Sequence, residues 1–329
     1  MPGSKQSNTE PLEFTLPSAT LEKIEQYKGV VVACSGGLDS SVLFRLLWEN
    51  LMAKKKFSLA ICHTNFGLRG EDSDADQTFI ESLAEKYQVP LFVQKITQEQ
   101  RDGRKSQSLQ EWARKVRYEH FHDLAENDGW LVALAHHEND LAENVILRLA
   151  RGTSPGGLAG LSEWNGPFWR PLLRVPRARL ENFAEQHGIS YREDASNLKP
   201  DYARNRVRHE LIPLLEELYP GAAGRISRCA REASELHGMC AEAWLAESKA
   251  LTGDGLSLPW LRSQSRTLRH LILSRAIGRA RKGRKALSHR LLERISDRID
   301  SRTEENWSFE LPAGKGRLVM RRGLLLLEK

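Results

Sequence analysis

The sequence predicts an α/β protein whose first part is a doubly wound parallel sheet and whose second part is smaller and mostly helical. Strand-like and helix-like segments alternate four times between residues 30 and 151, which is the order that builds a parallel sheet with helices on its faces. The strand-like segments are continuous apolar runs, as in strands covered on both sides. Beyond Gly221 the spacing of apolar residues is mostly helical, and a β-like element closes the chain.

Each element follows from its local pattern. The run from Val30 to Cys34 is rich in β-branched residues, which is typical of a buried strand. The segments between the strands repeat apolar residues every three or four positions, which is typical of amphipathic helices. The predicted strands span residues 30–34, 58–63, 91–96 and 130–136, and the predicted helices span residues 41–51, 74–87, 108–127, 138–151, 175–188 and 203–220.

We expect three regions: a flexible polar tail over residues 1–20, a catalytic domain over 21–220 and a basic domain over 221–329. The tail has no apolar core, so it does not read as a secretory signal. No run of about 18 apolar residues predicts a membrane span. The four cysteines form no C-x-x-C pair, which favours reduced thiols in a cytoplasmic protein over a metal or redox site. The sequence leaves the oligomeric state open, with a homodimer as one option.

Positive charge gathers in the second part of the chain. Residues 201–329 carry 25 basic against 16 acidic residues, whereas residues 1–200 carry 24 against 27. The stretch from Gly255 to Leu292 has ten basic residues and no acidic one. Such a stretch favours a nucleic-acid partner over a merely solvated helix face. The residues expected to contact the nucleic acid there are Arg275, Arg279, Arg281 and Lys282.

The segment SGGLDS, residues 35–40, follows the first predicted strand and carries the strongest sign of chemistry. Ligands of open parallel sheets bind at the carboxyl ends of strands, where free backbone N–H groups of a helix N-terminus attract anions. Gly36 and Gly37 allow close approach of a phosphate, and Asp39 beside phosphates calls for a cation such as Mg²⁺. The segment is neither a Walker A loop nor a G-x-G-x-x-G loop. It predicts a site for ATP and Mg²⁺, and the alternative is a plain turn with a capping side chain.

This segment resembles the pyrophosphate loop of the N-type ATP pyrophosphatases, with their adenine nucleotide alpha hydrolase-like fold. Four further blocks are similar to the tRNA(Ile)-lysidine synthetases within that superfamily. Together with the loop they cover about residues 25–220, and the end of the chain resembles the close of the family's C-terminal domain more weakly. The blocks are HTNFGLRGEDSDAD (63–76), SLQEWARKVRY (108–118), AHHENDLAENVILRLARGTSPGGLAGL (135–161) and EDASNLKPDYARNRVRHELIPLL (193–215).

The resemblance implies a two-step ligation on an isoleucine tRNA with a CAU anticodon. ATP adenylates the C2 oxygen of the wobble cytidine, and the amine of free lysine then displaces AMP to give lysidine. Asp140 and Glu143 match the family's D-x-x-E pair and are expected to bind the lysine amine, and Asp39 is expected to bind Mg²⁺. The other expected contacts are Ser35, Gly36, Gly37, Leu38, Ser40, His63 and His136 for ATP, Arg114 for the α-phosphate or tRNA, and Arg204, Asn205 and Arg208 for tRNA near the active site.

Four positions depart from the family pattern: Phe66, Gln110, Leu141 and Asn144. They leave the phosphate loop and the D-x-x-E pair intact. Three alternatives therefore stay open at the level of sequence. They are a divergent enzyme that joins another amine to tRNA, a tRNA thiolase, and a tRNA-binding paralogue without catalysis. The cysteine spacing disfavours the thiolase, and the intact SGGLDS loop disfavours the non-catalytic paralogue.

Overall fold

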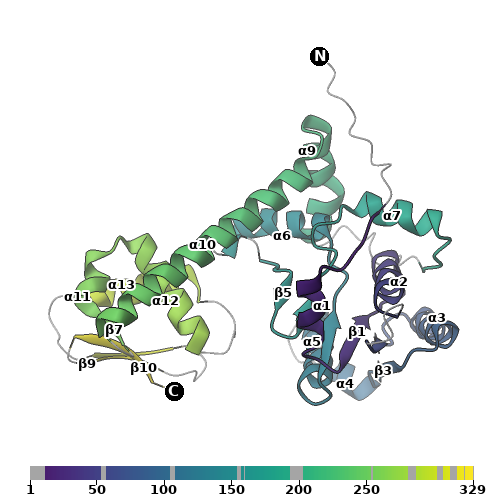
Figure 1. Cartoon of the computed structure of the whole chain (residues 1–329), viewed down its shortest axis with the longest axis horizontal. Helices are drawn as coiled ribbons and strands as arrows, with labels where there is room; N and C mark the ends of the chain where they lie inside the picture. The colour runs from purple at the N-terminus through teal and green to yellow at the C-terminus, as the bar shows by residue number, and fades with distance from the viewer. Residues whose placement is uncertain are drawn as a thin grey trace. The chain divides into compact units, whose positions relative to one another are not determined.

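The structure is a computed structural model that describes residues 12–52, 57–103, 108–153, 157–158, 160–192, 203–252, 255–280, 287–301, 307–311, 317–321 and 323–328. The chain divides into two compact units. The first comprises Met1–Asn144 and Leu161–Ser227, and the second comprises Val145–Gly160 and Arg228–Lys329. Figure 1 shows the elements of both units in chain order. No helix among the described residues combines the length and the apolar character needed to cross a bilayer.

The first unit is built on a six-stranded sheet with the order β3-β2-β1-β4-β6-β5. Strands β1 to β4 and β6 are parallel, and only the edge strand β5 runs antiparallel to its neighbour β6. The prediction of a mostly parallel sheet is thus confirmed. The strands are β1 (Gly29–Ala33), β2 (Leu59–Asn65), β3 (Leu91–Lys95), β4 (Trp130–Ala133), β5 (Trp164–Asn165) and β6 (Phe168–Trp169).

Helices cover both faces of this sheet. Alternate residues of β1 point to opposite sides, so Val30 and Val32 pack in one buried cluster and Val31 in another. The first cluster contains side chains of α1 (Ser18–Ile24), α2 (Leu38–Met52), α3 (Glu71–Tyr87) and α7 (Arg177–Gln186). The second contains Phe121 and Leu124 of α5 (Leu109–Glu126). A short helix α4 (Gln98–Asp102) lies between β3 and α5 in the chain.

The order of the strands creates a switch point between β1 and β4. The chain passes from β1 to β2 and β3 on one side, and then returns to place β4 on the other side of β1. The loops that follow β1 and β4 therefore open toward one another at the carboxyl edge of the sheet, where open α/β sheets bind ligands. Helix α2 begins directly after the first loop, and α6 (Glu138–Arg151) begins directly after the second.

The segment predicted as one helix over residues 203–220 is helical from 203 to 218 but contains a π-helical turn. It comprises α8 (Ala203–Arg206), a π-helical turn η3 (Val207–Leu211) and α9 (Ile212–Leu218). Pro213 explains the change of geometry, because it has no N–H to donate and the regular α-helical ladder cannot continue through it. The wider turn lies beside the carboxylates of α6, as described below.

The second unit joins helices to a small antiparallel sheet with the order β7-β10-β9-β8. Its buried cluster contains the apolar side of α13, including Leu292, Ile295 and Ile299. The elements are α10 (Ala222–Thr252), which starts within the first unit, β7 (Leu256–Ser257), α11 (Leu258–Ser263), α12 (Arg266–Ala280), α13 (His289–Asp300), β8 (Trp307–Glu310), β9 (Arg317–Arg321) and β10 (Leu324–Glu328). The prediction of a smaller, mostly helical second part is confirmed.

Candidate functional site

The loop after β1 is held in shape by its own serines. The hydroxyl of Ser40 donates to the carbonyl oxygen of Gly37 at 3.0 Å, and it accepts from the backbone N–H of Ser35 at 3.3 Å. The N–H of Gly37 donates to the hydroxyl of Ser35 at 3.4 Å. Gly36 has a φ of +90°, which only glycine adopts without strain. Leu38, the first residue of α2, packs against the core and so anchors the helix that begins here.

Asp39 lies in the first turn of α2, and one of its two carboxylate oxygens makes no hydrogen bond to the described residues. Its Oδ2 is 3.6 Å from Nε2 of His137. Its Oδ1 is buried and has no hydrogen-bond partner among the described residues. A buried carboxylate oxygen without a partner is costly, and a bound cation would satisfy it. Asp39 is therefore the strongest candidate cation ligand of this loop.

His137 connects the two loops at the switch point. Its side chain is 1% exposed, and its Nε2 lies 3.4 Å from Oδ2 of Asp140 as well as near Asp39. The N–H of Asp140 donates to Nδ1 of His137 at 3.4 Å, so the ring proton faces the carboxylates from Nε2. Burial lowers the pKa of His137, but attraction to the carboxylates of Asp39 and Asp140 outweighs burial and raises the pKa above its ordinary value.

The two histidines expected at the nucleotide, the buried His63 and the half-buried His136, both lie beside these loops. Nδ1 of His63 donates to the carbonyl oxygen of Cys34 at 2.8 Å, because a carbonyl can only accept. Burial lowers the pKa of His63. Burial also lowers the pKa of His136 to about 4, and its Nδ1 has no hydrogen-bond partner within the described part of the chain. Both rings are therefore neutral at neutral pH.

Asp140 and Glu143 form a buried carboxylate pair on α6, and two arginines neutralise them. The Nη2 of Arg204 donates to Oδ1 of Asp140, and its Nε donates to Oε2 of Glu143, both at 2.8 Å. The Nε of Arg208 donates to Oε1 of Glu143 at 2.5 Å, and its Nη2 reaches Oδ1 of Asp140 at 2.9 Å. The residues that were predicted separately as lysine contacts and as tRNA contacts are thus one network. Asn205 follows Arg204 on α8 and is half-buried.

The charges of this network determine its protonation. Burial raises the pKa of Asp140, but His137, His136 and the two arginines outweigh burial and lower it to about 2. Burial lowers the pKa of Arg208, but the hydrogen bond to Glu143 raises it above its ordinary value. Asp140 is therefore a carboxylate at any physiological pH, and a carboxyl with so low a pKa holds a cation better than it removes a proton.

The depressed pKa of His136 makes folding stability depend on pH. The unfolded chain takes up a proton on His136 near pH 6.5, whereas the folded chain does so near pH 4. The contribution of neutral His136 to the free energy of unfolding is therefore complete above pH 6.5. The free energy of unfolding falls by about 3 kcal/mol as the pH drops to 4. In urea unfolding at several pH values, His136→Gln is expected to remove this loss, because glutamine does not titrate. The matched variant is His122→Gln, an exposed histidine, which should keep the wild-type pH dependence. If the free energy of unfolding of His136→Gln fell with pH as steeply as that of the wild type, the loss of stability would not come from His136.

Arg114 lies on the exposed side of α5. Its guanidinium stacks 4.6 Å from the ring centroid of Tyr118, and its Nη2 donates to the Tyr118 hydroxyl at 3.3 Å. Its charge is among those that lower the pKa of His136, which indicates proximity to the nucleotide loops. Arg114 contacts neither Asp39 nor the carboxylate pair in any of the described hydrogen bonds and ion pairs.

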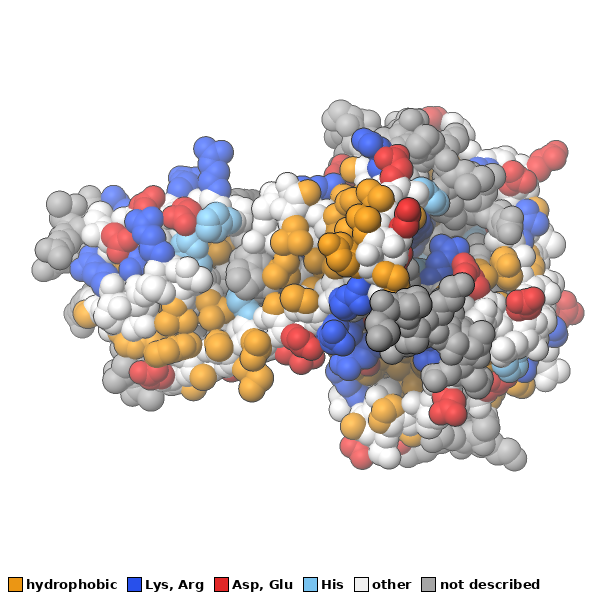
Figure 2. Space-filling view, turned by 90° about the horizontal axis from the view of Figure 1, so that it is seen from above, with side chains coloured by type: hydrophobic (Ala, Val, Ile, Leu, Met, Phe, Trp, Pro, Cys, Tyr) orange, Lys and Arg blue, Asp and Glu red, His pale blue; other side chains and the backbone are white. Residues whose placement is uncertain are grey.

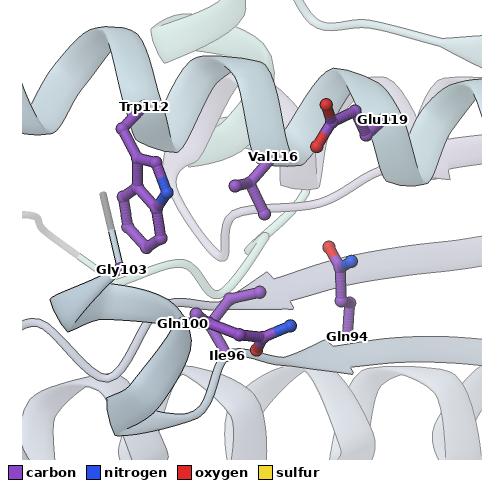
Figure 3. A pocket seen from close by; sticks show the side chains of 7 residues that line it. All are labelled: Gln94, Ile96, Gln100, Gly103, Trp112, Val116 and Glu119. Carbon is purple, nitrogen blue, oxygen red and sulfur yellow. The ribbon is translucent and has the colours of Figure 1, made fainter. Parts of the chain in front are cut away.

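A separate pocket of about 340 Å³ lies between β3, α4 and α5. Figure 3 shows Trp112, Val116 and Glu119 of α5 on one side of it, facing Gln94 on β3 and Gln100 on α4. None of the residues predicted for the site lines this pocket. It is therefore distinct from the cluster around Asp39 and Asp140.

Much of the basic stretch in the second unit is engaged in the fold of that unit. Arg262 donates to the carbonyl oxygens of Ile299 and Ser301, and the buried Arg269 is paired with Asp300 at 2.6 Å. Arg275, a predicted tRNA contact, donates from Nε to Glu242 at 2.8 Å and stays half-exposed. Figure 2 shows acidic side chains among the basic ones on this face of the unit. Arg281, Lys282 and the side chain of Arg279 lie outside the described residues.

Sequence reasoning missed two features of this site. His137, and not His136, is the histidine that contacts Asp39, and neighbouring loop residues carry no periodicity that would have separated them. Arg192 donates its backbone N–H to the Gly36 carbonyl oxygen at 2.9 Å and its Nε to Asp76 at 2.5 Å. Arg69 pairs with the same carboxylate. The acid-rich block after Asn65 was the only sequence signal for this second ion cluster.

Comparison with known proteins gives a consistent result. Residues 12–215 match a family model described as the PP-loop domain. The tRNA(Ile)-lysidine synthase of Geobacter sulfurreducens is 36% identical over 269 residues, which cover 77% of this chain and 55% of the relative. That of Rhodopirellula baltica is 34% identical, covering 68% of this chain and 62% of the relative. The chain thus spans between half and two thirds of the length of these two relatives.

A solved structure shares the fold. The U34-tRNA thiolase NcsA of Methanococcus maripaludis, solved with its [4Fe-4S] cluster, superposes with a TM-score of 0.52 at 20% sequence identity. The match covers 64% of this chain and 74% of that chain. At this identity the likeness extends to the fold alone.

Proposed function

The chain belongs to the PP-loop domain family, and we propose that it is an ATP-dependent ligase that joins free lysine to C2 of the wobble cytidine in an isoleucine tRNA with a CAU anticodon. One observation carries the proposal. The phosphate loop and a buried carboxylate pair meet at one switch point, where His137 lies within 3.6 Å of both Asp39 and Asp140. The reaction of the tRNA(Ile)-lysidine synthases named above needs both a site for ATP phosphates, such as this loop, and a site for a cationic amine, such as this carboxylate pair.

The loop residues suit the triphosphate of ATP. The free N–H groups at the start of α2 and the hydroxyl of Ser35 offer donors to the pyrophosphate portion, and the hydroxyl of Ser40 holds the loop in shape through Gly37. Gly36 leaves space there, since a Cβ would approach only Phe79, at 3.5 Å. Mg²⁺ fits Asp39, whose buried Oδ1 lacks a partner within the described chain, and when bound it would neutralise charge on the departing pyrophosphate.

The carboxylate pair suits a cationic amine. Asp140 and Glu143 are 8% and 1% exposed, and their present partners are guanidinium groups. These groups stand where the ammonium of lysine would bind. Arg204 is the more exposed of the two, with 41% of its side chain accessible against 25% for Arg208. We expect lysine to replace contacts of Arg204 first.

The two steps balance as follows. The cytidine C2 oxygen attacks the α-phosphorus of ATP, a P–O bond forms, and pyrophosphate leaves. The lysine amine then attacks C2, a C–N bond forms, the C2–O bond breaks, and AMP leaves while the amine gives up a proton. In this scheme Ser35 and the N–H groups at the start of α2 hold the leaving pyrophosphate, and Asp140 and Glu143 orient the amine.

The cysteines do not support a thiolase. Cys34 is 4% exposed and Cys62 is 1% exposed. Burial raises the pKa of the Cys62 thiol to about 12 and raises that of Cys34 as well. Neither supplies a thiolate at neutral pH, and thiolates are the reactive form. Cys229 and Cys240 belong to the second unit.

The direct test is nucleoside mass spectrometry of an isoleucine tRNA transcript after incubation with the full chain, ATP, Mg²⁺ and lysine. We expect lysidine in place of one cytidine, with one AMP and one pyrophosphate released per lysidine. Parallel incubations with other amines, or with a transcript whose wobble base is uridine, should give no product. Pyrophosphate release without lysidine would reassign the enzyme to another modification.

We further propose that Arg275, Arg279, Arg281 and Lys282 contact tRNA phosphates. Replacing three of them with glutamine is expected to reduce the slope of log affinity for tRNA against log salt concentration by roughly two to three units. Each phosphate contact releases counterions from the tRNA, and the variant makes three fewer such contacts. ATP affinity should not change. The control replaces Lys86, Lys95 and Lys115, exposed lysines of the first unit. Equal salt dependences in wild type and the first triple variant would move the tRNA contacts elsewhere.

A further inference from the structure

Three potential metal ligands meet in the second unit. His289 and Glu293 are four residues apart on α13, so they share one face of that helix, and His270 approaches them from α12. Nε2 of His289 lies 3.4 Å from Oε1 of Glu293, and Nε2 of His270 lies 3.8 Å from the same oxygen. All three ligand atoms lie within 4.8 Å of one another. On this unit, Figure 2 shows histidine, acidic and basic side chains side by side.

His270 supplies an independent sign that a ligand is missing. Its residue is 8% exposed, and its Nε2 is buried without a hydrogen-bond partner among the described residues. The distance of 3.8 Å to Glu293 is too long for a hydrogen bond. A buried imidazole nitrogen left in this way is costly unless something else binds it. The nitrogen faces the two other ligand atoms, so a shared ion would satisfy it.

The spacing matches a small tetrahedral ion. Bonds of about 2.0–2.1 Å from zinc to nitrogen or oxygen place tetrahedral ligand atoms roughly 3.3–3.4 Å apart. The distances of 3.4 Å and 3.8 Å to Glu293 are at or slightly above this separation, and the two histidine nitrogens lie within 4.8 Å of each other. A modest closure of the three side chains around one ion would therefore complete the geometry. The side chain of His289 is 68% exposed. One coordination position therefore opens toward water.

An ion cluster next to the three ligands holds the Glu293 carboxylate in place. Arg266 and Arg269 are opposed by three carboxylates, those of Glu293, Asp297 and Asp300. Arg266 binds Oε2 of Glu293 at 3.0 Å, which leaves Oε1 directed at the histidines.

We propose that His270, His289 and Glu293 form a zinc site with a water molecule in the fourth position. The ion fastens α12 to α13, the two helices that enclose residues 281–286 in the sequence. Arg266 acts on the site through Glu293, as a positioning residue that fixes the orientation of the carboxylate. The proposal is independent of the ligase reaction, which the first unit carries.

The protein offers a matched control for helical spacing alone. His122 and Glu126 on α5 are also four residues apart, and Nδ1 of His122 lies 3.7 Å from Oε1 of Glu126. Both side chains are exposed, and no third ligand is grouped with them among the described residues. A histidine and a glutamate on one turn of a helix bind zinc weakly without a third ligand, so this pair is expected to remain empty.

The test uses the untagged full-length chain after treatment with a chelator. We expect one Co²⁺ per chain to bind with the visible absorption of a tetrahedral nitrogen–oxygen site, and one Zn²⁺ to displace it. His289→Gln and Glu293→Gln should each weaken Zn²⁺ binding at least about a hundredfold, since losing a direct ligand exceeds the 10–100-fold effect of an outer-shell partner. Both residues are at least partly exposed, so the fold should survive, and circular dichroism checks it.

His122→Gln should leave the Co²⁺ spectrum and the affinity unchanged. Zn²⁺ should also raise the melting temperature of the wild type but not that of His289→Gln, because only a bound ion stabilises the folded state. A wild-type chain without a tetrahedral spectrum would overturn the site. So would a spectrum that persists in His289→Gln, which would place the ion at other ligands such as Cys229 and Cys240.

Discussion

Asp39→Asn is expected to slow pyrophosphate release roughly 10²–10³-fold at saturating ATP and tRNA, the cost of losing one strong electrostatic contact in the transition state. The variant keeps the shape of the side chain but loses the charge that a cation beside the phosphates requires. The fold should be nearly unaffected, because Oδ1 makes no hydrogen bond to any described residue and Oδ2 only approaches His137. The measurement is pyrophosphate release over a range of Mg²⁺ concentrations.

The matched control for this variant is Glu49→Gln on the same helix. Glu49 pairs with Arg45 at 2.6 Å and lies ten residues after Asp39 on α2, away from the phosphate loop. It therefore tests the loss of one negative charge on the same helix. Its rate should be that of the wild type. If Asp39→Asn retained a near-normal rate at low Mg²⁺, Asp39 would be a helix-capping residue and not a cation ligand.

Asp140→Asn and Glu143→Gln are expected to raise KM for lysine about 30–100-fold, the equivalent of roughly 2–3 kcal/mol for one charge-assisted hydrogen bond. KM for ATP should change far less. The amide variants are chosen because truncation to alanine would leave Arg204 and Arg208 without acceptors, and an unpaired buried charge is itself strongly destabilising. Steady-state kinetics with each substrate varied in turn, together with urea unfolding, separates the two effects.

Glu181→Gln on α7 is the control, because Glu181 forms an exposed pair with Arg177 at 3.0 Å. It should leave both KM values unchanged. Equal increases in KM for lysine and ATP in the Asp140 and Glu143 variants would reassign the pair to the nucleotide. A loss of stability without any change in KM would reassign it to holding α8 and η3 on α6.

The sheet was largely predictable because its central strands are buried on both sides. Such strands must be apolar along their whole length. The run from Val30 to Cys34 is continuously apolar and rich in β-branched residues, which is typical of a strand buried on both faces. The short strands β5 and β6, at one end of the sheet, were not predicted. Each has two residues, Trp164–Asn165 and Phe168–Trp169, which are too few to show a period. The pairing of β6 with β4 depends on tertiary structure.

The site was predictable where chemistry depends on local spacing. Asp140 and Glu143 are three residues apart on a helix, which places them on one side without any knowledge of the fold. Their pairing with Arg204 and Arg208 joins residues more than 60 positions apart in the chain, and that depends on how the η3 turn lies against α6. No sequence pattern indicates that contact. The same limit applies to His270 and His289, which share a site only because α12 packs on α13.

The guanidinium groups over Asp140 and Glu143 amount to a tethered competitor for any incoming cation. A free competitor can be diluted, but Arg204 and Arg208 remain at the same effective concentration at every protein concentration. The apparent dissociation constant of an amine at this pair equals the intrinsic value divided by the fraction of molecules in which the arginines have left. Affinity for the amine is therefore set partly by how firmly the chain from Ala203 to Leu211 holds its conformation. Selection could tune that affinity from residues that the amine never touches.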